Sequence, residues 1–587
     1  MKKIVDLIIE ELTPAFEACG YDRQYIRVTR SNRPDLCEFQ CNGAMAAAKA
    51  YKKKPIEIAG EVTERAKGSR MFSEISAALP GFINIRLDPG YLAEYTGAVA
   101  GDGKYGLETA AQPETIIVDY GGANVAKPLH VGHLRSAVIG ESMKRIGRYM
   151  GHHVIGDVHL GDWGLQMGLI IEELRDRQPE LPYFDESFEG EFPQEAPFTI
   201  SELEEIYPAA SEKSKKDEAF RERAQQATLK LQSGYPPFRA IWEHIMSVSL
   251  ADLKKNYANL NVSFDLWKGE SDAQSYIPGL IADLVDKGLA YESEGALVVD
   301  IAKEGDAKEY PPCIVRKSDG AALYATSDLA TLIEREKDFK PDRYIYVVDK
   351  RQELHFIQVF RAAKKAGIVK EETPMAFLGF GTMNSKDGGP FKTRDGGVMR
   401  LETLINEIVK AVYKKIEEKQ KVPENERQRT AQIIGLAALK YGDLSNQATK
   451  DYVFDIDRFI SFEGNTGPHI QYTIVRIKSI LEKYGAGEDA EMMRILPAGS
   501  ATEKELQLKL CGFSEAVESA FIETAPHKIC QYMAAVADAF NDFYQENKIL
   551  AEEDKKRQAG WIRLITLAKD ILNTCMDLLG MDSPEHM

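Results

Sequence analysis

The sequence predicts a multidomain α/β protein, in which a doubly wound parallel sheet lies between a small N-terminal α/β domain and a C-terminal all-α bundle. Three observations lead to this fold class. The chain has 587 residues, whereas one domain typically holds about 150. Short apolar runs alternate with helical patterns in the middle of the chain, which favours a parallel sheet. After about residue 401 only helical periodicity remains.

The N-terminal domain is expected to span residues 1–108. Short helical and strand-like patterns alternate there, and one strand-like run covers residues 81–87. The Gly/Asp-rich stretch at 101–104 is typical of a domain boundary. These patterns predict a small appended α/β domain.

The sheet domain is expected at 109–400. Residues 115–119 form a short apolar run that predicts a buried strand, and after a loop the apolar residues recur at helical spacing up to Gly151. Further strand signals lie at 153–155, 296–299 and 344–348, with a charged helical insertion at about 170–265. Strands alternating with helices predict that these runs form one parallel sheet.

The last third of the chain is expected to be helical. Met533, Val536, Phe540 and Tyr544 trace one face of a helix. We assign 401–455 to a helical connector and 456–587 to a helical domain.

The composition indicates an ordinary globular protein. Hydrophobic residues make up 44% and charged residues 28% of the chain, which argues against disorder. No apolar run is long enough to span a membrane, and Asp6 and Glu10 interrupt the first apolar stretch too early for a secretory signal. We therefore expect a cytoplasmic location. The net charge of −17 argues against a sequence-blind nucleic-acid coat, because phosphate binding needs clustered cations.

The cysteines predict reduced thiols and no metal site. The chain has seven of them, an odd number scattered along its length, unlike a disulfide framework. Cys37 and Cys41 have a spacing that suits a metal, but no second Cys or His pair lies at suitable spacing nearby. We therefore expect no zinc.

The loop at 123–133 is the first candidate for chemistry. It follows the predicted strand at 115–119 and opens directly into a helix. Ligands bind at this edge of open α/β sheets, and helix N-termini favour phosphate. Gly132 would let the backbone approach a flat adenine, and His130 and His133 can donate hydrogen bonds to phosphate oxygens. His-x-Gly-His alone is a short pattern that occurs by chance, but its position favours a nucleotide site.

A second candidate loop lies at 386–397, where cations alternate with glycines. Such a loop suits a clamp on departing pyrophosphate. The alternative is a solvated basic turn, since charge runs usually face water.

The first loop resembles the HIGH region of class I aminoacyl-tRNA synthetases, and the second is similar to a degenerate KMSKS loop. Within that class the strings at 124–136, 160–164, 324–328 and 463–468 most resemble the arginyl-tRNA synthetases, and the similarity runs in order over essentially the whole chain. One departure is that Phe391, Lys392, Thr393 and Arg394 stand where other class I enzymes have Lys-Met-Ser-Lys-Ser.

The resemblance implies a Rossmann-like catalytic domain that activates arginine with ATP and Mg²⁺ and then loads it onto tRNA(Arg). It also implies that tRNA must be bound before activation proceeds well. The implied catalytic residues are His130, Gly132, His133, Lys127 and Lys392. The implied ATP-binding residues are Ala123, Asn124, Pro128, Leu129, Val131 and Arg394.

The arginine pocket can also be reasoned from chemistry. A guanidinium is planar and always charged, and carboxylates match it best. Tyr324 and Asp328 are four residues apart and would share one helical face. The family pattern places both in the pocket, adds Asp119 as a second carboxylate, and gives Asn124 and Gln352 the α-amino and α-carboxylate groups. For Asp119 the alternative is a cap or a salt-bridge partner at a strand end.

Two regions are expected to hold the tRNA. By resemblance, the N-terminal domain touches the tRNA elbow around residues 33–35 and 40–43, and the helical domain binds the anticodon. The basic residues expected there are Arg476, Lys478, Lys555, Lys556 and Arg557, for each of which a solvated helix surface is the alternative. Tyr472 and Tyr544 could stack on unpaired bases or pack in the core. The family usually ends near Glu-Arg-Met, whereas this chain ends with Glu585, His586 and Met587.

Three other functions remain open. A class I synthetase for glutamate would need a cationic pocket, and one for cysteine would usually need zinc ligands. A small-molecule nucleotidyltransferase would not need the long helical C-terminal region, and an inactive homologue would be expected to lose His130 or His133. We expect a monomer with no membrane or DNA partner, although nothing in the sequence determines the oligomeric state.

Overall fold

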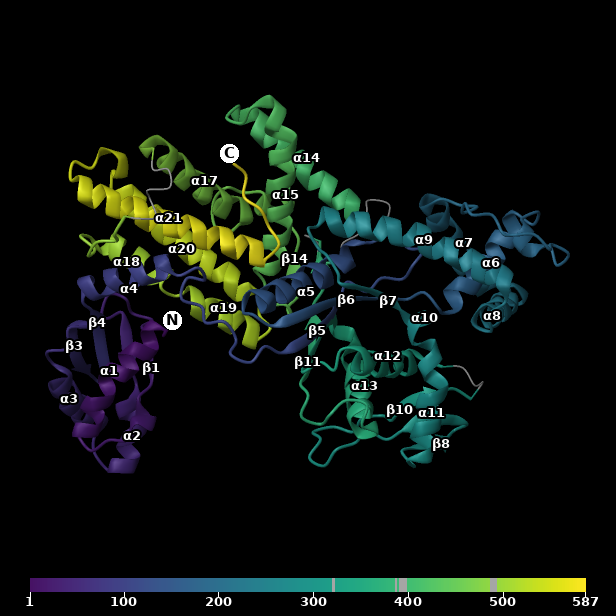
Figure 1. Ribbon diagram of the computed structural model, residues 1–587, viewed down its shortest axis with the longest axis horizontal. Coiled ribbons are helices and arrows are strands. Elements are labelled where there is room, and N and C mark those ends of the chain that lie inside the picture. The colour runs from purple at the N-terminus through teal and green to yellow at the C-terminus, as the bar shows by residue number, and fades with distance from the viewer. Residues whose placement is uncertain (319–321, 386–387, 390–398, 486–492) are drawn as a thin grey trace.

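The computed structural model of the protein describes residues 1–318, 322–385, 388–389, 399–485 and 493–587. A parallel sheet occupies the centre, the N-terminal domain lies beneath the C-terminal helices, and a helical insertion projects to the other side (Figure 1). These parts confirm the predicted fold class.

The N-terminal domain is a four-stranded antiparallel sheet in the order β1-β2-β4-β3, covered by helices. Ile83, Ile85 and Leu87 alternate along β4 and are fully buried, which gives the sheet one apolar face. Its elements are α1 (Ile4–Ala18), β1 (Val28–Arg30), β2 (Phe39–Cys41), α2 (Gly43–Tyr51), α3 (Pro55–Ala66), β3 (Phe72–Ala78), β4 (Phe82–Leu87) and α4 (Pro89–Gly101).

The central sheet is parallel and has the strand order β12-β11-β5-β6-β7. Ile116, Ile117 and Val118 are all fully buried, because helices cover both faces, and the strand therefore reads as a continuous apolar run. From β5 the chain adds β6 and β7 on one side and β11 and β12 on the other. The carboxyl edge between β5 and β11 is therefore the topological switch point of the sheet. The strands are β5 (Thr115–Tyr120), β6 (His153–Leu160), β7 (Leu266–Gly269), β11 (Arg343–Asp349) and β12 (Met375–Phe380).

One predicted strand belongs elsewhere. Residues 296–299 form β9 (Ala296–Val299), which pairs with β8 (Ala290–Ser293) and β10 (Cys313–Arg316) in a separate antiparallel sheet. The prediction of a place in the parallel sheet was therefore wrong. A short apolar run suits either kind of sheet, and only its hydrogen-bonding partners distinguish them.

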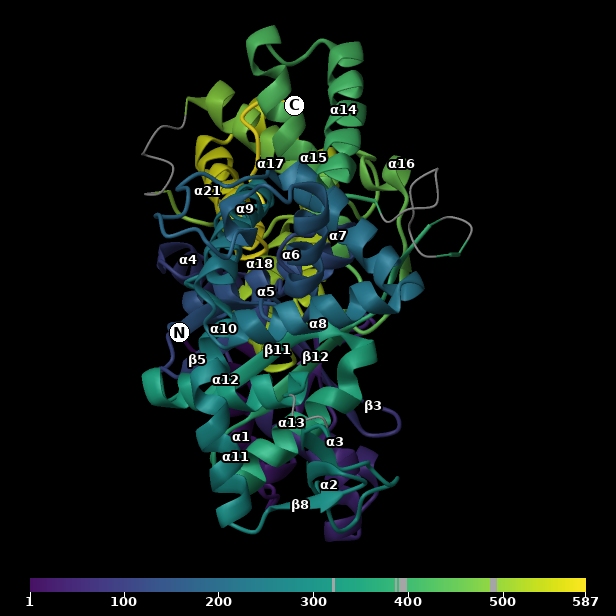
Figure 2. The same cartoon turned by 90° about the vertical axis from the view of Figure 1, so that its right-hand side faces the viewer.

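Different helices cover the two faces of the central sheet. Helix α5 (Val131–Tyr149) packs with Ile116 and Val118, whereas Ile117 packs with α11, α12 and α13. In the turned view α5 lies above the sheet and α12 and α13 lie below it (Figure 2). The helices of the second face are α10 (Glu270–Ala273), α11 (Ile277–Asp286), α12 (Tyr324–Asp338) and α13 (Glu353–Ala366).

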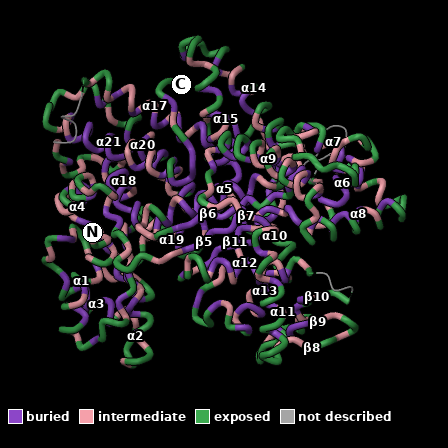
Figure 3. The backbone as a smooth tube through the Cα atoms, turned by 45° about the vertical axis from the view of Figure 1, so that its right-hand side comes forward, coloured by how far each residue is buried: buried purple, intermediate pink, exposed green. Residues whose placement is uncertain are grey.

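The insertion follows β6 and consists of α6 (Leu165–Arg177), α7 (Ile200–Lys216), α8 (Glu218–Gln232) and α9 (Pro236–Asn259). Buried backbone is concentrated around the central strands and α5, while the outer end of the insertion is largely exposed (Figure 3). Short 3₁₀ helices connect elements at Arg23–Tyr25, Pro182–Phe184, Gln274–Tyr276, Lys350–Gln352, Glu424–Glu426 and Ile549–Ala551.

The C-terminal region is helical, as predicted. Met533, Val536 and Phe540 are fully buried, while Tyr544 is 38% exposed. A short parallel pair, β13 (Met383–Asn384) with β14 (Tyr452–Val453), joins this region to the sheet domain. Its helices are α14 (Leu401–Lys419), α15 (Arg427–Leu444), α16 (Ile456–Phe459), α17 (Gly467–Tyr484), α18 (Ala501–Leu510), α19 (Phe513–Ile522), α20 (His527–Glu546) and α21 (Lys555–Leu578). Over the described residues, no helix combines the length and apolarity that crossing a membrane requires.

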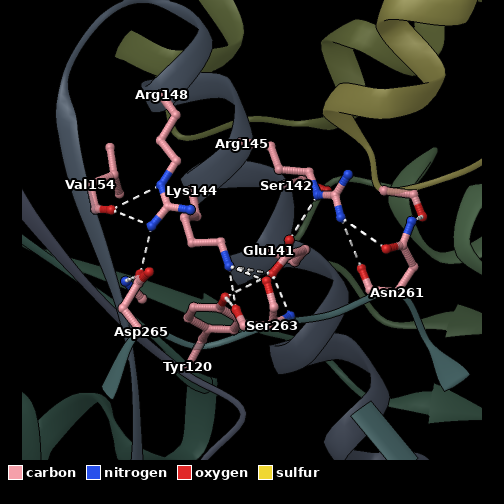
Figure 4. A network of polar contacts seen from close by, with 12 residues as sticks. Tyr120, Glu141, Ser142, Lys144, Arg145, Arg148, Val154, Asn261, Ser263 and Asp265 are labelled. Atoms are coloured by element: carbon pink, nitrogen blue, oxygen red, sulfur yellow. Dashed lines mark hydrogen bonds and ion pairs between the residues drawn. The ribbon is translucent and has the colours of Figure 1, made fainter. Parts of the chain in front are cut away.

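A buried polar network anchors helix α5 (Figure 4). Glu141 accepts a hydrogen bond from the Tyr120 hydroxyl at 2.8 Å and forms ion pairs with Lys144 at 2.9 Å and Arg145 at 2.7 Å. Arg145 also pairs with Asp577 at 2.9 Å, at the C-terminal end of α21. The helix that follows the candidate nucleotide loop is therefore tied to both β5 and the C-terminal domain.

Lys440 extends this connection from α15. Its ammonium donates to the carbonyl oxygens of Leu260 at 2.8 Å and Gly580 at 2.7 Å. The side chain is fully buried, and burial lowers its pKa to about 7. One lysine thus joins the connector, the end of the insertion and the end of the chain.

Candidate active site

The candidate site lies at the carboxyl edge of the central sheet, at the switch point between β5 and β11. The loop at 121–130 leaves β5 there, and Lys350–Gln352 leaves β11 beside it. Backbone bonds join Val125 N–H to Gly161 O and Gly161 N–H to Ala123 O, both at 3.1 Å, so the loop runs alongside the end of β6. Such an edge is where open α/β sheets bind ligands.

Contact with the insertion fixes the middle of this loop. Ala126 has a positive φ of 59°, which costs a non-glycine residue about 1–3 kcal/mol. Its N–H donates to the Ser249 hydroxyl of α9 at 2.9 Å. This hydrogen bond holds the strained backbone beside Lys127.

His130 and His133 lie at the start of α5 and are fixed by backbone hydrogen bonds. The His130 N–H donates to Nδ1 of His133 at 3.1 Å, and the Gly132 N–H donates to Nδ1 of His130 at 3.0 Å. Because each Nδ1 accepts, the neutral ring carries its proton on Nε2. Burial, followed by the charge of His130, lowers the pKa of His133 to about 3; burial and then Lys127 lower that of His130. Both rings are therefore neutral Nε2–H donors near pH 7.

The absence of a side chain at Gly132 makes room for the ring of His130. A Cβ at this position would lie 2.7 Å from Cε1 and 2.9 Å from Nδ1 of His130. The missing side chain thus leaves room for the His130 imidazole, and the approach of a flat adenine to this backbone stays a prediction. The glycine allows the histidine to fold back over its own helix start.

The second candidate loop falls mostly outside the described residues, including Lys392 and Arg394. The residues that follow it, 399–401, are described and pair directly with the first loop. Val131 N–H donates to Met399 O at 3.1 Å, and Leu401 N–H donates to Leu129 O at 2.9 Å. His130 and Arg400 form an isolated antiparallel bridge between these bonds. The segment that follows the second candidate loop therefore lies beside the first loop, although about 270 positions separate the paired residues.

A group of acidic and aromatic side chains lies at the same edge, around the start of α12. Tyr324 opens this helix and is 72% exposed, and Asp328 follows one turn later. Nε2 of His355, on α13, lies 2.5 Å from Oδ2 of Asp328 and orients that carboxylate. Burial and then Glu270 raise the pKa of the Tyr324 hydroxyl, so Glu270 faces the same group.

Glu270 was not predicted from the sequence. Burial raises its pKa to about 7, the nearby carboxylates of Asp162 and Asp328 add to the rise, and His159 opposes it. The residue follows β7 directly, and side chains at the carboxyl ends of parallel strands gather at one edge. That rule would have singled it out, but the weak strand signal of β7, just after the segment assigned to the helical insertion, was not recognised in the sequence. His355 gave no sequence signal, because its role depends on how α13 packs against α12.

Asp119 has an internal partner. Nη2 of Arg335 lies 2.5 Å from Oδ2 of Asp119 and 2.6 Å from Oδ2 of Asp157, and Nη1 of Arg335 donates to the Tyr346 hydroxyl at 2.9 Å. Burial outweighs this guanidinium and raises the pKa of Asp119. The salt-bridge alternative thus describes Asp119 in the structure. Through Arg335, Asp119 and Asp157 join α12 to β5 and β6.

The other predicted residues of the first loop are distributed along it. Ala123, Leu129 and Val131 are buried and shape the loop, while Pro128 is half-buried. Asn124 is exposed and bridges to Gly161. Gln352 is exposed at the end of β11. Over the described residues, no group of three or more His, Cys, Asp or Glu side chains is arranged to hold a metal ion.

The helical C-terminal region contains a cavity of about 940 Å³. Tyr472 and Tyr544 both line it, with the Arg476 guanidinium 4.7 Å and 5.4 Å from their ring centroids. Arg476 lowers the pKa of the Tyr472 hydroxyl. Lys478, His586 and Met587 line the same cavity. The structure brings these predicted residues together, whereas Lys555, Lys556 and Arg557 lie at the start of α21. In the N-terminal domain, Arg33 pairs with Asp35 at 2.7 Å on the surface.

A parallel sheet whose strand order reverses between β5 and β11, a His-x-Gly-His loop at a helix start, and a distant segment at 399–401 paired with that loop fit the catalytic domain of a class I aminoacyl-tRNA synthetase. Comparison with known families agrees. Residues 95–456 match "tRNA synthetases class I (R), catalytic domain", residues 2–87 match "Arginyl tRNA synthetase N terminal domain", and residues 470–587 match "DALR anticodon binding domain". The chain belongs to the arginyl-tRNA synthetase family.

Individual relatives support this assignment. The chain is 60% identical to the arginine–tRNA ligase of Agathobacter rectalis, with both chains covered completely. It is 57% identical to that of Alkaliphilus oremlandii, over 99% of this chain and all of the relative. Two solved arginyl-tRNA synthetases share the fold. The Plasmodium falciparum structure has a TM-score of 0.82 at 24% identity and covers 100% of this chain and 99% of its own. The Thermus thermophilus structure has a TM-score of 0.78 at 23% identity, with both chains covered completely.

Proposed function

We propose that the protein is an arginine–tRNA ligase, which activates L-arginine with ATP and transfers it to the terminal adenosine of tRNA(Arg). The observation that carries this proposal is the pairing of two chemically distinct groups at one sheet edge. Neutral imidazole donors stand at the start of α5, and the carboxylates of Glu270 and Asp328 gather at the start of α12. The first group suits phosphate and the second suits a guanidinium.

In the activation step, a carboxylate oxygen of arginine attacks the α-phosphorus of ATP in line. The new O–P bond forms as the bond to the bridging oxygen breaks, and pyrophosphate leaves with that electron pair. No proton must be removed from the attacking carboxylate. Nε2–H of His130 and His133 donate to the phosphate oxygens where negative charge develops, and Lys127 adds a positive charge. Magnesium enters as part of the MgATP substrate, and we propose that Lys392 and Arg394 bind the departing pyrophosphate.

The guanidinium of the substrate is recognised by charge and shape. Asp328, oriented by His355, and Glu270 supply carboxylates, and Tyr324 covers the ligand from one side. Because the pKa of Glu270 is about 7, a bound guanidinium would hold this residue in its ionised form. We assign Asp119 a positioning role through Arg335, and Asn124 and Gln352 the α-amino and α-carboxylate groups.

For tRNA binding, we propose that unpaired anticodon bases enter the cavity of Tyr472, Arg476 and Tyr544. Aromatic faces and a guanidinium are the groups on which single-stranded bases stack. The N-terminal domain, 1–108, would contact the tRNA elbow, and the units 109–400, 401–455 and 456–587 would serve as catalytic domain, connector and anticodon domain. We further propose that the protein acts as a cytoplasmic monomer.

The test is ATP–pyrophosphate exchange with each amino acid, in the presence and absence of tRNA(Arg). We expect exchange with arginine alone, and only when tRNA(Arg) is present. Exchange driven by glutamate or cysteine would overturn the specificity. Adenylate transfer to a small molecule without any tRNA charging would support a nucleotidyltransferase instead.

A further inference from the structure

Helix α7 of the insertion contacts both the first loop, at Lys127, and the segment that follows the second loop, at Arg400. Glu204 and Tyr207 are three residues apart on this helix and share one face. Oε2 of Glu204 pairs with Nη2 of Arg400 at 2.5 Å. The Lys127 ammonium lies 4.4 Å from the centroid of the Tyr207 ring. A single turn of α7 thus contacts Lys127 within the first loop and Arg400, which follows the second loop.

These contacts are built into the fold. The Glu204 side chain is only 8% exposed, and burial raises its pKa while Arg400 opposes the rise. Ser249, on the neighbouring insertion helix α9, is buried and bonds the backbone next to Lys127. Tyr207 also lies near Tyr324. The pKa of the Tyr324 hydroxyl is raised mainly by burial, next by the charge of Glu270, and least by Tyr207. Tyr207 therefore stands between the ATP loop and the arginine pocket.

We propose that Tyr207 is a positioning residue for the activation step, which holds the Lys127 ammonium in place to receive the phosphates of ATP. This proposal rests on the proposed function. An aromatic face attracts a cation without neutralising its charge, so Lys127 keeps its full charge for the phosphates. A carboxylate in the same place would compete with ATP. A lysine side chain is also among the costliest to immobilise, so a ring that confines it before ATP arrives lowers the cost of binding.

The test compares Tyr207→Leu with Tyr207→Phe, which keeps the aromatic face. Tyr235→Leu is the matched control, because it removes a second Lys–Tyr contact of the insertion, in which Lys230 lies 5.4 Å from the Tyr235 ring centroid. MgATP binding is measured by isothermal titration calorimetry without amino acid, together with KM values in pyrophosphate exchange and thermal unfolding midpoints. Tyr207→Leu should weaken ATP binding and raise KM for ATP by about tenfold, as the loss of a partly desolvated cation–π contact implies. KM for arginine and the unfolding midpoint should stay unchanged, and Tyr207→Phe and Tyr235→Leu should resemble the parent protein.

A double-mutant cycle identifies the mechanism. In a Lys127→Met background, Tyr207→Leu should cause no further loss of ATP affinity, because the group that it positions is already absent. Additive losses would overturn the proposal, as would unchanged ATP binding in Tyr207→Leu or an equal loss in Tyr207→Phe. The calorimetric measurement involves no amino acid. If the parent protein bound ATP in this way but failed to exchange pyrophosphate with arginine, the proposed function would fail while this inference stood.

Discussion

Replacing His133 with alanine should slow adenylate formation by about 100-fold or more. The structure presents Nε2–H of this ring as a neutral donor, since Nδ1 already accepts the His130 N–H at 3.1 Å. Removal of one donor to developing charge typically costs about 3–4 kcal/mol, which is a rate loss of about 10² to 10³. Loss of the hydrogen bond to the His130 N–H adds about 1 kcal/mol of structural cost.

His133→Asn separates the two contributions. The asparagine carbonyl can accept the His130 N–H and restore the helix start, but its amide ends short of the position of the imidazole Nε2. If donation to phosphate is what matters, His133→Asn should remain nearly as slow as His133→Ala. If the capping bond alone matters, the asparagine should restore most of the rate.

The pH dependence provides a second criterion. Since the pKa of His133 is about 3, the folded protein keeps this ring neutral between about pH 5.5 and 8.5, and exchange should show no titration from it there. The unfolded chain takes up a proton near pH 6.5, so the contribution of this group to stability is lost as pH falls from about 6.5 toward 3. The assay is pyrophosphate exchange at saturating arginine and tRNA(Arg). A rate within about threefold of the parent for His133→Ala would refute the reasoning, as would an acid limb near pH 6.5 that the substitution removes.

Further predictions concern the pocket and the packing beneath it. Asp328→Asn should raise KM for arginine by about tenfold or more with little change in KM for ATP, because a charge-assisted contact becomes neutral; an unaltered KM for arginine would contradict its role. KM for arginine should fall as pH rises through about 7, where Glu270 ionises, and Glu270→Gln should remove that dependence; a slope of the opposite sign would count against the assignment. Arg335→Met should lower the free energy of unfolding by about 3–5 kcal/mol, since Asp119 and Asp157 lose their buried partner, and a thermal midpoint equal to that of the parent would argue against it. Lys440→Met removes two buried hydrogen bonds at any pH, so its unfolding midpoint should lie below that of the parent at pH 10, and this deficit should shrink or reverse at pH 7. The pKa of Lys440 is lowered to about 7, so the penalty for burying its charge is full below that pH and fades as pH rises toward about 10.4. Calorimetric midpoints that shift equally at both pH values would exclude this penalty.

Local sequence patterns were sufficient to predict the strand, loop and helix on which much of the candidate site is built. The strand at 115–119, the loop at 123–133 and the helix that begins at Val131 are adjacent in the chain, and their hydrophobic period and glycine placement need no distant partner. The same holds for Tyr324 and Asp328, which one helical turn brings to the same face. Short-range geometry and binary patterning therefore predicted the fold class, the strand–loop–helix unit around 123–133 and the shared helical face of Tyr324 and Asp328, whereas the resemblance to the family gave these residues their roles.

Long-range packing decided the rest. Asp119 met Arg335 instead of remaining an open carboxylate, Glu270 entered the pocket from an edge strand with little sequence signal, and α7 placed Tyr207 beside Lys127. Each of these contacts joins residues more than 50 positions apart in the chain. Whether a charged or aromatic side chain faces water, a ligand or an internal partner depends on which elements pack together. The environment of such a side chain is determined by burial and electrostatic interactions over the whole fold, so it cannot be predicted from a short stretch of sequence.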